Sequence, residues 1–274
     1  PLGVVGRGQP VVVVGVIIIM IRRPPRSTLF PCPTLFLSAH AVKTVTLGSG
    51  ARLPYDKLIL SPGIDFVDGS VDGWDLGAQN RMPHAYKAGS QTELLKAQIA
   101  AIPQGGVYAM VSPPNPYRCP PGPYERVSMV AHVLKKTNPT AKIIIADPKP
   151  TFSKMALFEE GWATHYPGMI DWVGPDFGGD IVSVDPDTMT LSIDGEVMSV
   201  DVCNVIPAMK AGHIAAVAGV TQGNWAPVNA ADMSSKLVPT FMFLGTRANR
   251  ATCRNPPSPP THRPRSVQPH FCQR

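Results

Sequence analysis

The sequence lacks the short motifs by which metal and dinucleotide sites are usually recognised. None of its 5 cysteines forms a C-x-x-C pair, so a zinc site has little support, and the odd number does not indicate a disulfide scaffold. No G-x-G-x-x-G turn follows a strand, and the acidic ribose partner that should come after such a turn is missing. Paired carboxylates with a spacing typical of hydrolases are not evident either. We therefore predict no metal site and no hydrolytic site.

Long apolar runs are scarce as well. The run Val11–Ile21 has roughly half the length that a bilayer requires, and its strongest positive charge follows it, whereas in a signal peptide the charge comes first. The formal net charge is +6, but much of the basicity lies in Arg22–Arg26 and Arg247–Arg274, and the chain between them mixes both signs. We therefore expect neither a membrane span nor nucleic-acid binding.

Proline, by contrast, is abundant. The 31 prolines are about twice the average usage, and they gather in Arg22–Pro33, Pro113–Pro123 and Asn255–Pro269. The stretch Met20–Ser38 has no apolar period and resembles the translation of a sequencing-adapter oligonucleotide, although a natural basic, proline-rich linker is the alternative. Residues 1–41 are therefore expected to be a non-native or damaged N-terminus.

From about Val42 to Leu244 the chain has the pattern of an α/β protein. The spacing of apolar residues predicts helices at Ser90–Ala101, Tyr124–Lys136 and Phe152–Tyr166. It predicts strands at Val42–Leu47, Leu58–Leu60, Gly106–Val111, Ala141–Ala146, Val202–Ile206 and Thr240–Leu244, and an antiparallel pair, Asp180–Ser192 and Gly195–Val202, joined near Asp194-Gly195.

The segment from Gly106 to Asp147 is a strand, a loop, a helix and a second strand, the repeating unit of a doubly wound parallel sheet. The loop is rich in proline, which donates no backbone N–H, so it cannot cradle a pyrophosphate, and no nicotinamide site is expected there. The helix is predicted to bury a stripe formed by Val127, Val130, Ala131, Val133 and Leu134.

The same loop contains an unusual segment, Tyr117–Arg126, which reads YRCPPGPYER. It resembles the active-site segment of the flavoprotein chains of flavocytochrome c sulfide dehydrogenases, and more loosely that of sulfide:quinone oxidoreductases. Other segments resemble the same family in the same order: LPYDKLILSPGID at 53–65, MPHAYKAGSQT at 82–92, TFSK at 151–154 and GNWAPV at 223–228.

The resemblance implies a glutathione-reductase-like α/β fold, with a doubly wound central NAD-like domain and an incomplete FAD-binding domain. It divides the chain into a remnant of the FAD-binding domain at 42–104, the central domain at 105–202 and a return to the FAD-binding domain at 203–245. Residues 246–274 are expected to be a frameshifted, disordered tail, because codons for Gly245–Pro257 exist that, read one base out of frame, encode a G-D segment resembling that of related flavoproteins.

Cys119 is predicted to be the catalytic residue. Cysteine reacts as the thiolate, and the N-terminus of the helix that follows Pro120 and Pro121 favours a nearby negative charge. The resemblance implies that sulfide attacks this cysteine in its disulfide with a second one, giving a persulfide. An inert buried thiol is the alternative, and Cys203, in an apolar strand, is predicted to be only a packing residue. No pairing with Cys119 is expected for Cys32, Cys253 and Cys272.

The resemblance also assigns residues to the FAD site. These are Ser61, Pro62, Gly63 and Ile64 in a turn, Pro120 and Pro121 beside the cysteine, and Trp225, Pro227 and Gly245 near the G-D motif, whose aspartate is replaced by Thr246. Because the phosphate loop, the aspartate and the second cysteine are missing, this copy is expected neither to hold FAD stoichiometrically nor to turn over sulfide.

The implied function is that of an FAD-dependent sulfide dehydrogenase subunit that passes electrons to a cytochrome c subunit in the periplasm. One alternative is a flavoenzyme like sulfide:quinone oxidoreductase, which would need a membrane-binding amphipathic segment. The other is a non-catalytic α/β binding module.

Overall fold

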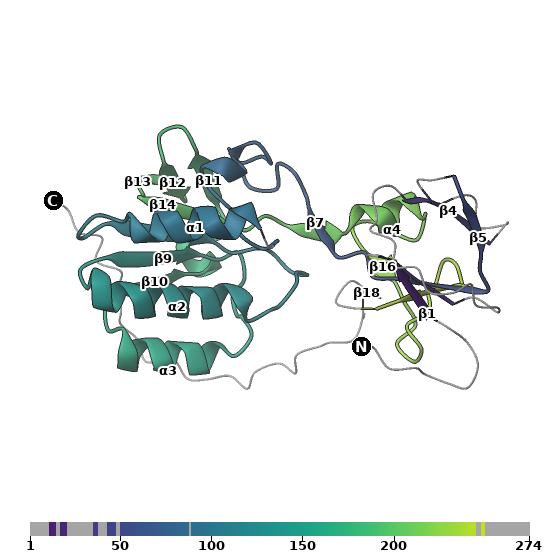
Figure 1. Ribbon diagram of the computed structural model, residues 1–274. Coiled ribbons are helices and arrows are strands. Elements are labelled where there is room, and N and C mark those ends of the chain that lie inside the picture. Colours follow the sequence, from purple (N-terminus) through teal and green to yellow (C-terminus); the bar gives the residue numbers. More distant parts are fainter. Residues whose placement is uncertain are drawn as a thin grey trace.

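The structure is a computed structural model that describes residues 11–14, 17–20, 35–37, 43–47, 50–87, 89–244 and 248–249. These residues form two lobes, with strand β7 between them (Figure 1). Most of the predicted damaged N-terminus, 1–41, and most of the predicted tail, 246–274, lie outside the described residues. No helix within the described ranges is long and apolar enough to cross a membrane.

A four-stranded parallel sheet forms the middle of the larger, central lobe. Its spatial order is β10 (Ile170–Val173), β9 (Lys142–Ala146), β8 (Val107–Val111) and β14 (Val202–Val205). Strands that are covered on both faces read as continuous apolar runs, as β8 and β9 do. The parallel, doubly wound sheet predicted from the sequence is therefore confirmed.

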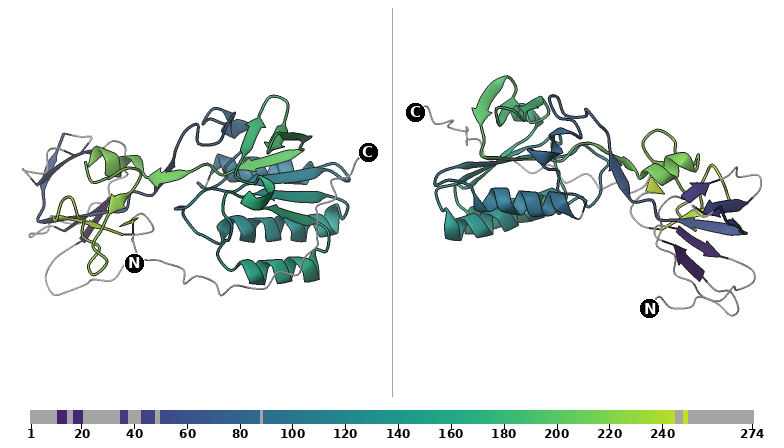
Figure 2. Two further views of the ribbon diagram at one scale, coloured as in Figure 1. Left: turned by 180° about the vertical axis from the view of Figure 1, so that it is seen from behind. Right: turned by 45° about the horizontal axis from the view of Figure 1, so that its top comes forward.

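Different elements cover the two faces of this sheet (Figure 2). Helices α1 (Ser90–Ala100), α2 (Gly122–Thr137) and α3 (Met155–His165) lie on one face, where Tyr108 and Met110 join their core. An antiparallel meander of β11 (Val182–Asp185), β12 (Thr190–Ile193) and β13 (Glu196–Ser199) lies on the other, packed against Ala109 and Val111. Successive side chains of β8 point to opposite faces of the sheet, so they alternate between the core under the helices and the core under the meander. The lobe includes α1 and all of β14. The predicted segment 105–202 begins after α1 and ends at the first residue of β14.

The meander differs from its prediction in one respect. The single strand expected at Asp180–Ser192 is divided into β11 and β12 by a turn, in which the Asp185 carboxylate accepts the backbone N–H of Asp187 at 2.8 Å. An aspartate that bonds the backbone two residues ahead favours a turn over an extended strand. The next turn is as predicted, with positive φ at both Asp194 (49°) and Gly195 (84°), as a two-residue hairpin requires.

Helix α2 begins at Gly122, two residues before its predicted start, because proline is tolerated in the first turn of a helix. Four of the five predicted core residues are buried, but Val133 is 47% exposed. Together with Met129, which is 72% exposed, it lines an apolar groove of about 720 Å³ between α1 and α2. The predicted burial of Val133 is therefore wrong, because α1 leaves this side of α2 uncovered.

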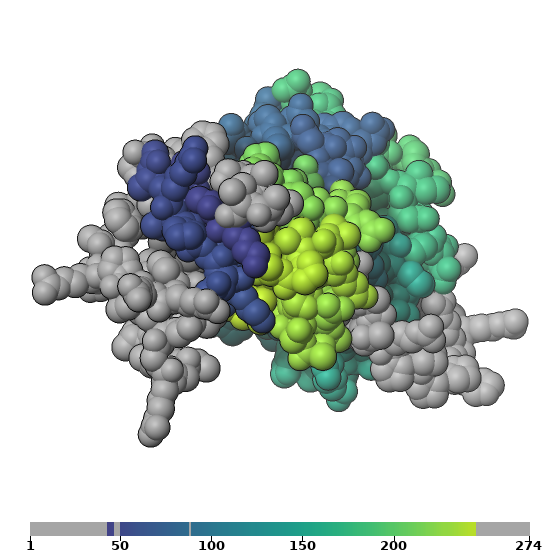
Figure 3. Space-filling view, turned by 90° about the vertical axis from the view of Figure 1, so that its right-hand side faces the viewer, coloured from purple at the N-terminus to yellow at the C-terminus, as the bar shows by residue number. Residues whose placement is uncertain are grey.

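The outer lobe is built on a second sheet, in the order β1 (Val11–Val14), β2 (Ile17–Met20), β6 (Lys57–Leu60) and β17 (Phe241–Phe243). β6 and β17 are parallel neighbours, which brings the segments around them side by side (Figure 3). The lobe is completed by β3 (Leu35–Leu37), β4 (Thr44–Leu47), β5 (Arg52–Pro54), the short helix α4 (His213–Val217), and β16 (Ala226–Pro227) paired with β18 (Ala248–Asn249).

A two-stranded antiparallel ribbon of β7 (Ile64–Phe66) and β15 (Met209–Ala211) joins the lobes. Ile64 and Phe66 are buried in the core of the central lobe. Asp65, between them, forms an ion pair with Lys87 at 2.5 Å and accepts the backbone N–H of His213 at 2.6 Å. Burial alone would raise the pKa of Asp65, but these two hydrogen bonds lower it below its ordinary value.

Candidate active site

Cys119 lies in the loop between β8 and α2, two residues before the N-cap residue Pro121. It is exposed, and its φ of 58° is in the left-handed region, which is unfavourable by about 1–2 kcal/mol for a residue other than glycine. The backbone N–H of Gly122 donates to the Cys119 carbonyl at 2.8 Å and closes a tight turn. A strained turn thus presents the predicted catalytic residue to solvent at the start of a helix.

The loop is fastened on both sides of Cys119. The Tyr117 hydroxyl donates to the Pro120 carbonyl at 2.6 Å, and the Arg118 backbone N–H donates to the sulfur of Met209 at 3.2 Å. Met209 belongs to β15, so the loop contacts the ribbon between the lobes. Pro120 is exposed and Pro121 is half-buried, and both shape this loop.

Tyr86 lies against the same turn. A Cβ atom built on Gly122 would lie 2.7 Å from the Tyr86 hydroxyl oxygen and 3.2 Å from the Cys119 sulfur. These two atoms therefore border the same small space, which glycine leaves open. Burial raises the pKa of Tyr86, so its hydroxyl stays protonated and can donate a hydrogen bond.

A buried polar network holds Tyr86 in place. Arg126, from α2, donates to the carbonyls of His84 at 3.0 Å and Ala85 at 2.6 Å, and its guanidinium lies 5.1 Å from the centroid of the Tyr86 ring. The Tyr86 backbone N–H donates to Nδ1 of His84 at 3.0 Å. Asn204, in β14, accepts a hydrogen bond from Arg126 at 2.8 Å. Residues 84–86 are therefore tied to α2 and to the central sheet.

The neighbouring corner of the sheet is closed. Doubly wound folds bind nucleotides at the carboxyl ends of such strands, often through an acidic residue. Here Asp147, which follows β9 and is 0% exposed, contacts the Lys149 ammonium at 2.6 Å and accepts the Tyr124 hydroxyl at 2.6 Å. Lys149 also donates to Ser112 at 3.0 Å and to the Pro113 carbonyl at 2.6 Å. These contacts leave Asp147 no room for a ribose.

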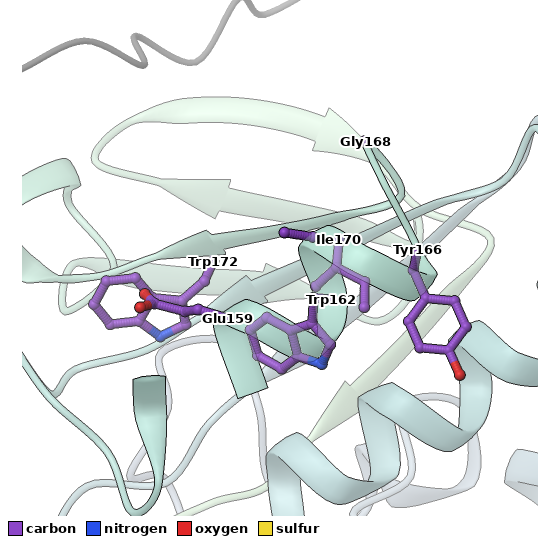
Figure 4. Close-up of a pocket in the computed structure, with 7 residues that line it drawn as sticks. Glu159, Trp162, Tyr166, Gly168, Ile170 and Trp172 are labelled. Atoms are coloured by element: carbon purple, nitrogen blue, oxygen red, sulfur yellow. The ribbon is translucent and has the colours of Figure 1, made fainter. Parts of the chain in front are cut away.

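An aromatic pocket of about 290 Å³ lies behind this corner, between α3 and β10. Figure 4 shows its lining residues, which include Glu159, Trp162, Tyr166, Gly168, Ile170 and Trp172. The indole N–H of Trp172 donates to Asp147 at 3.0 Å, and that of Trp162 donates to Ser128 at 2.8 Å. Both indole N–H groups therefore have hydrogen-bond partners within the lobe. The two tryptophans of the pocket wall thus have a structural role, and that of Trp172 is to hold Asp147.

The turn predicted to contact FAD is largely occupied by the fold itself. Pro62 and Ile64 are buried, while Ser61 and Gly63 are half-buried. Gly212 packs backbone to backbone on this turn: its N–H donates to the Gly63 carbonyl at 2.9 Å, and any side chain there would collide with the Pro62 carbonyl. Only Ser61 and Gly63 therefore retain an accessible surface.

The remaining predicted flavin residues are dispersed. Trp225 is half-buried and packs against the central core that contains Ile64 and is flanked by Tyr86 and Tyr117. Pro227 belongs to β16 in the outer lobe. Gly245 lies outside the described residues, as do Cys32, Cys253 and Cys272.

The residues that the structure describes do not form a complete FAD site. Ser61, Gly63 and Trp225 offer part of one wall, but the Gly63 carbonyl accepts the Gly212 N–H and the Pro62 carbonyl is covered by Gly212. The sequence has no G-x-G-x-x-G loop for the diphosphate. In the described part of the chain, no group of three or more histidine, cysteine or acidic side chains is arranged to hold a metal ion.

Cys203 has the opposite environment to Cys119. It is 0% exposed in β14, where it packs against the meander side of the sheet. Burial raises its pKa to about 12, so it stays a neutral thiol. The prediction that Cys203 is a packing residue is confirmed.

Residues 92–207, from the start of α1 to just beyond β14, match the family model described as sulfide dehydrogenase [flavocytochrome c] flavoprotein chain, central. The central lobe is similar to this family. The family is one of flavoprotein oxidoreductases, and the match covers the Cys119 loop, the Asp147 corner and α2.

Solved structures share the fold. The sulfide:quinone oxidoreductase of Aquifex aeolicus is 19% identical with a TM-score of 0.55, covering 75% of this chain and 49% of that chain. Putidaredoxin reductase, in its complex with putidaredoxin, is 17% identical with a TM-score of 0.52 (78% and 49% covered), and a ferredoxin reductase from Rhodopseudomonas palustris is 15% identical with a TM-score of 0.52 (77% and 48% covered). The chain spans about half the length of these structures. The glutathione-reductase-like fold is thereby confirmed.

Proposed function

We propose that the chain is a sulfide dehydrogenase flavoprotein subunit in which Cys119 is the sulfur-reactive residue. The observation that carries the proposal is the exposed Cys119, held in a strained turn at the start of α2, inside a domain similar to that family. Buried structural cysteines such as Cys203 have neither access nor a nearby helix N-terminus to favour the anion.

A complete enzyme of this class would use FAD as electron acceptor and a cytochrome c subunit as partner, and by the same resemblance it would work in the periplasm. The residues of this chain do not complete an FAD site, so we expect it neither to be yellow when purified nor to reduce cytochrome c with sulfide. The part of the chemistry that the chain can perform alone is sulfur transfer to Cys119.

Inorganic polysulfide is a substrate for that half-reaction. The Cys119 thiolate attacks a terminal sulfur of the polysulfide, forming one S–S bond and breaking another. The electron pair of the broken bond leaves with the shortened polysulfide, so no further oxidant is needed. The product is a persulfide on Cys119.

The test is to incubate the purified chain with polysulfide, block thiols with an alkylating reagent, and quantify the persulfide on each cysteine-containing peptide by mass spectrometry. We expect persulfide on Cys119 in the folded protein and on Cys203 only after unfolding, because Cys203 is buried. Cys119→Ser should remove the first signal and leave the second. A folded protein whose Cys119 stays unmodified would contradict the proposal.

A further inference from the structure

The hydroxyl of Tyr86 is an exception among the described residues, because its oxygen is buried and has no hydrogen-bond partner. Buried hydroxyls are nearly always hydrogen-bonded, since removing such a group from water without a partner is unfavourable. Phenylalanine has the same shape without this penalty. The presence of tyrosine therefore calls for an acceptor that is not a fixed part of the fold.

The sulfur of Cys119 is placed to become that acceptor. It borders, with the Tyr86 hydroxyl, the space that Gly122 leaves open. The two atoms are not hydrogen-bonded to each other in this structure, and a neutral thiol is only a weak acceptor. Once the sulfur is anionic, an O–H donor in a buried position forms a strong, charge-assisted hydrogen bond with it.

Contacts with His84 and Arg126 fix the orientation of Tyr86. Its backbone N–H is bonded to His84 and its ring lies over the guanidinium of Arg126, so the hydroxyl cannot turn toward solvent without breaking these contacts. The positive charges of Arg126 and Arg118 both act on the Tyr86 hydroxyl in the direction that favours an anion.

We infer that Tyr86 is a positioning residue, whose hydroxyl donates a hydrogen bond to the anionic sulfur carried by Cys119, either the thiolate or the persulfide. The inference rests on the proposed reactivity of Cys119. It gives a role to a tyrosine that lies 33 positions earlier in the sequence and outside the cysteine loop.

The test is Tyr86→Phe, with the alkylation rate of Cys119 measured by peptide mass spectrometry between about pH 5 and pH 10. Loss of a hydrogen bond to the anion should move the midpoint of the rate profile upward by about one pH unit and lower the rate at neutral pH about tenfold. The melting temperature should be unchanged or higher, because an unpartnered hydroxyl is removed. A tyrosine with only a packing role would give no such change in the profile.

Tyr117→Phe is the matched control. It removes a hydroxyl that is bonded to Pro120 in the same loop, so it should lower the melting temperature and move the midpoint much less than Tyr86→Phe does. If Tyr86→Phe does not fold, Gly122→Ala tests the same contact, because the new methyl group separates Tyr86 from Cys119.

An unchanged midpoint in Tyr86→Phe, or in Gly122→Ala if that variant is used instead, would overturn the inference, as would an equal shift in Tyr117→Phe. The alkylation profile needs neither FAD nor sulfide. A shifted midpoint without persulfide formation would therefore refute the proposed function and leave the role of Tyr86 standing, and the reverse result would do the opposite.

Discussion

Two loops leave the same edge of the central sheet with opposite characters. The loop after β9 turns its charged groups inward, so that Asp147 and Lys149 neutralise each other in the protein interior. The loop after β8 turns Cys119 outward on a strained backbone. In a dinucleotide-binding domain both loops would serve one ligand. The difference shows that a nucleotide-type sheet can close its nucleotide corner and still expose a thiol beside it, since function resides in the site and not in the fold.

The largest effect is expected from opening the closed loop. Lys149→Met leaves the Asp147 carboxylate buried opposite an apolar group, and removing one partner of a buried ion pair lowers the free energy of unfolding by about 3–5 kcal/mol. Urea unfolding at neutral pH measures this change. A loss below about 1 kcal/mol would mean that the pair does not close the corner.

The matched control is an exposed ion pair of the same lobe. Arg81 and Asp187 lie 2.8 Å apart, with side chains 52% and 89% exposed. Asp187→Asn should change the free energy of unfolding by no more than about 1 kcal/mol. A similar loss of unfolding free energy in Lys149→Met and Asp187→Asn would show that the buried pair is no more important for stability than a surface pair.

The pH dependence of stability tests the polar network beside the Cys119 loop. Burial, aided by the charges of Lys87 and Arg126, lowers the pKa of His84 to about 4, whereas an unfolded histidine titrates near 6.5. Between these values only the unfolded state binds the proton, so the contribution of His84 is complete above pH 6.5 and is lost as the pH falls toward 4.

That contribution is up to about 3 kcal/mol. His84→Gln should therefore show a smaller loss of unfolding free energy than the parent chain when urea unfolding at neutral pH is compared with unfolding near pH 4. His132→Gln, at an exposed position, should behave like the parent. Identical slopes for all three chains would show that His84 is not held neutral by the network under Tyr86.

The smallest effect concerns the strained turn. Cys119→Gly should be more stable than Cys119→Ala by about 1 kcal/mol, because glycine adopts a positive φ without penalty. The order should reverse at Cys203, in an extended strand, where glycine weakens the strand relative to alanine. Equal stabilities of the two Cys119 variants would remove the argument that the fold holds this thiol in an unfavourable conformation.

The pattern of the sequence was sufficient for the repeating units of the central sheet. Apolar runs such as KIIIA at β9 are bounded by turn residues, so strand positions could be predicted nearly to the residue. Cys119 could be singled out because its neighbours form a rare motif. The predicted start of helix α2 is two residues late, because the proline-rich segment before Tyr124 has the composition of a loop, although the first helical turn accepts Pro123.

The networks around the site could not be predicted in the same way. Arg126 reaches carbonyls about 40 positions earlier and Asn204, which lies 78 positions later, and no local period records such contacts. The only available signal for the closed corner was an aspartate directly after a buried strand, which a ribose-binding residue would share. The exposure of Val133 depends on where α1 ends, and that is a tertiary property.

The ribbon of β7 and β15 fixes how the outer lobe is rotated, about the strand axis, relative to the central lobe. Successive side chains of a strand point to opposite faces, so with Ile64 and Phe66 anchored in the central core, Asp65 must project on the other side toward Lys87 and the first residue of α4. Inserting a single residue before Ile64 would rotate the whole outer lobe by half a turn about the strand axis. The orientation of the outer lobe relative to the central sheet therefore depends on the burial of Ile64 and Phe66. Any surface that both lobes form together depends on the same two side chains.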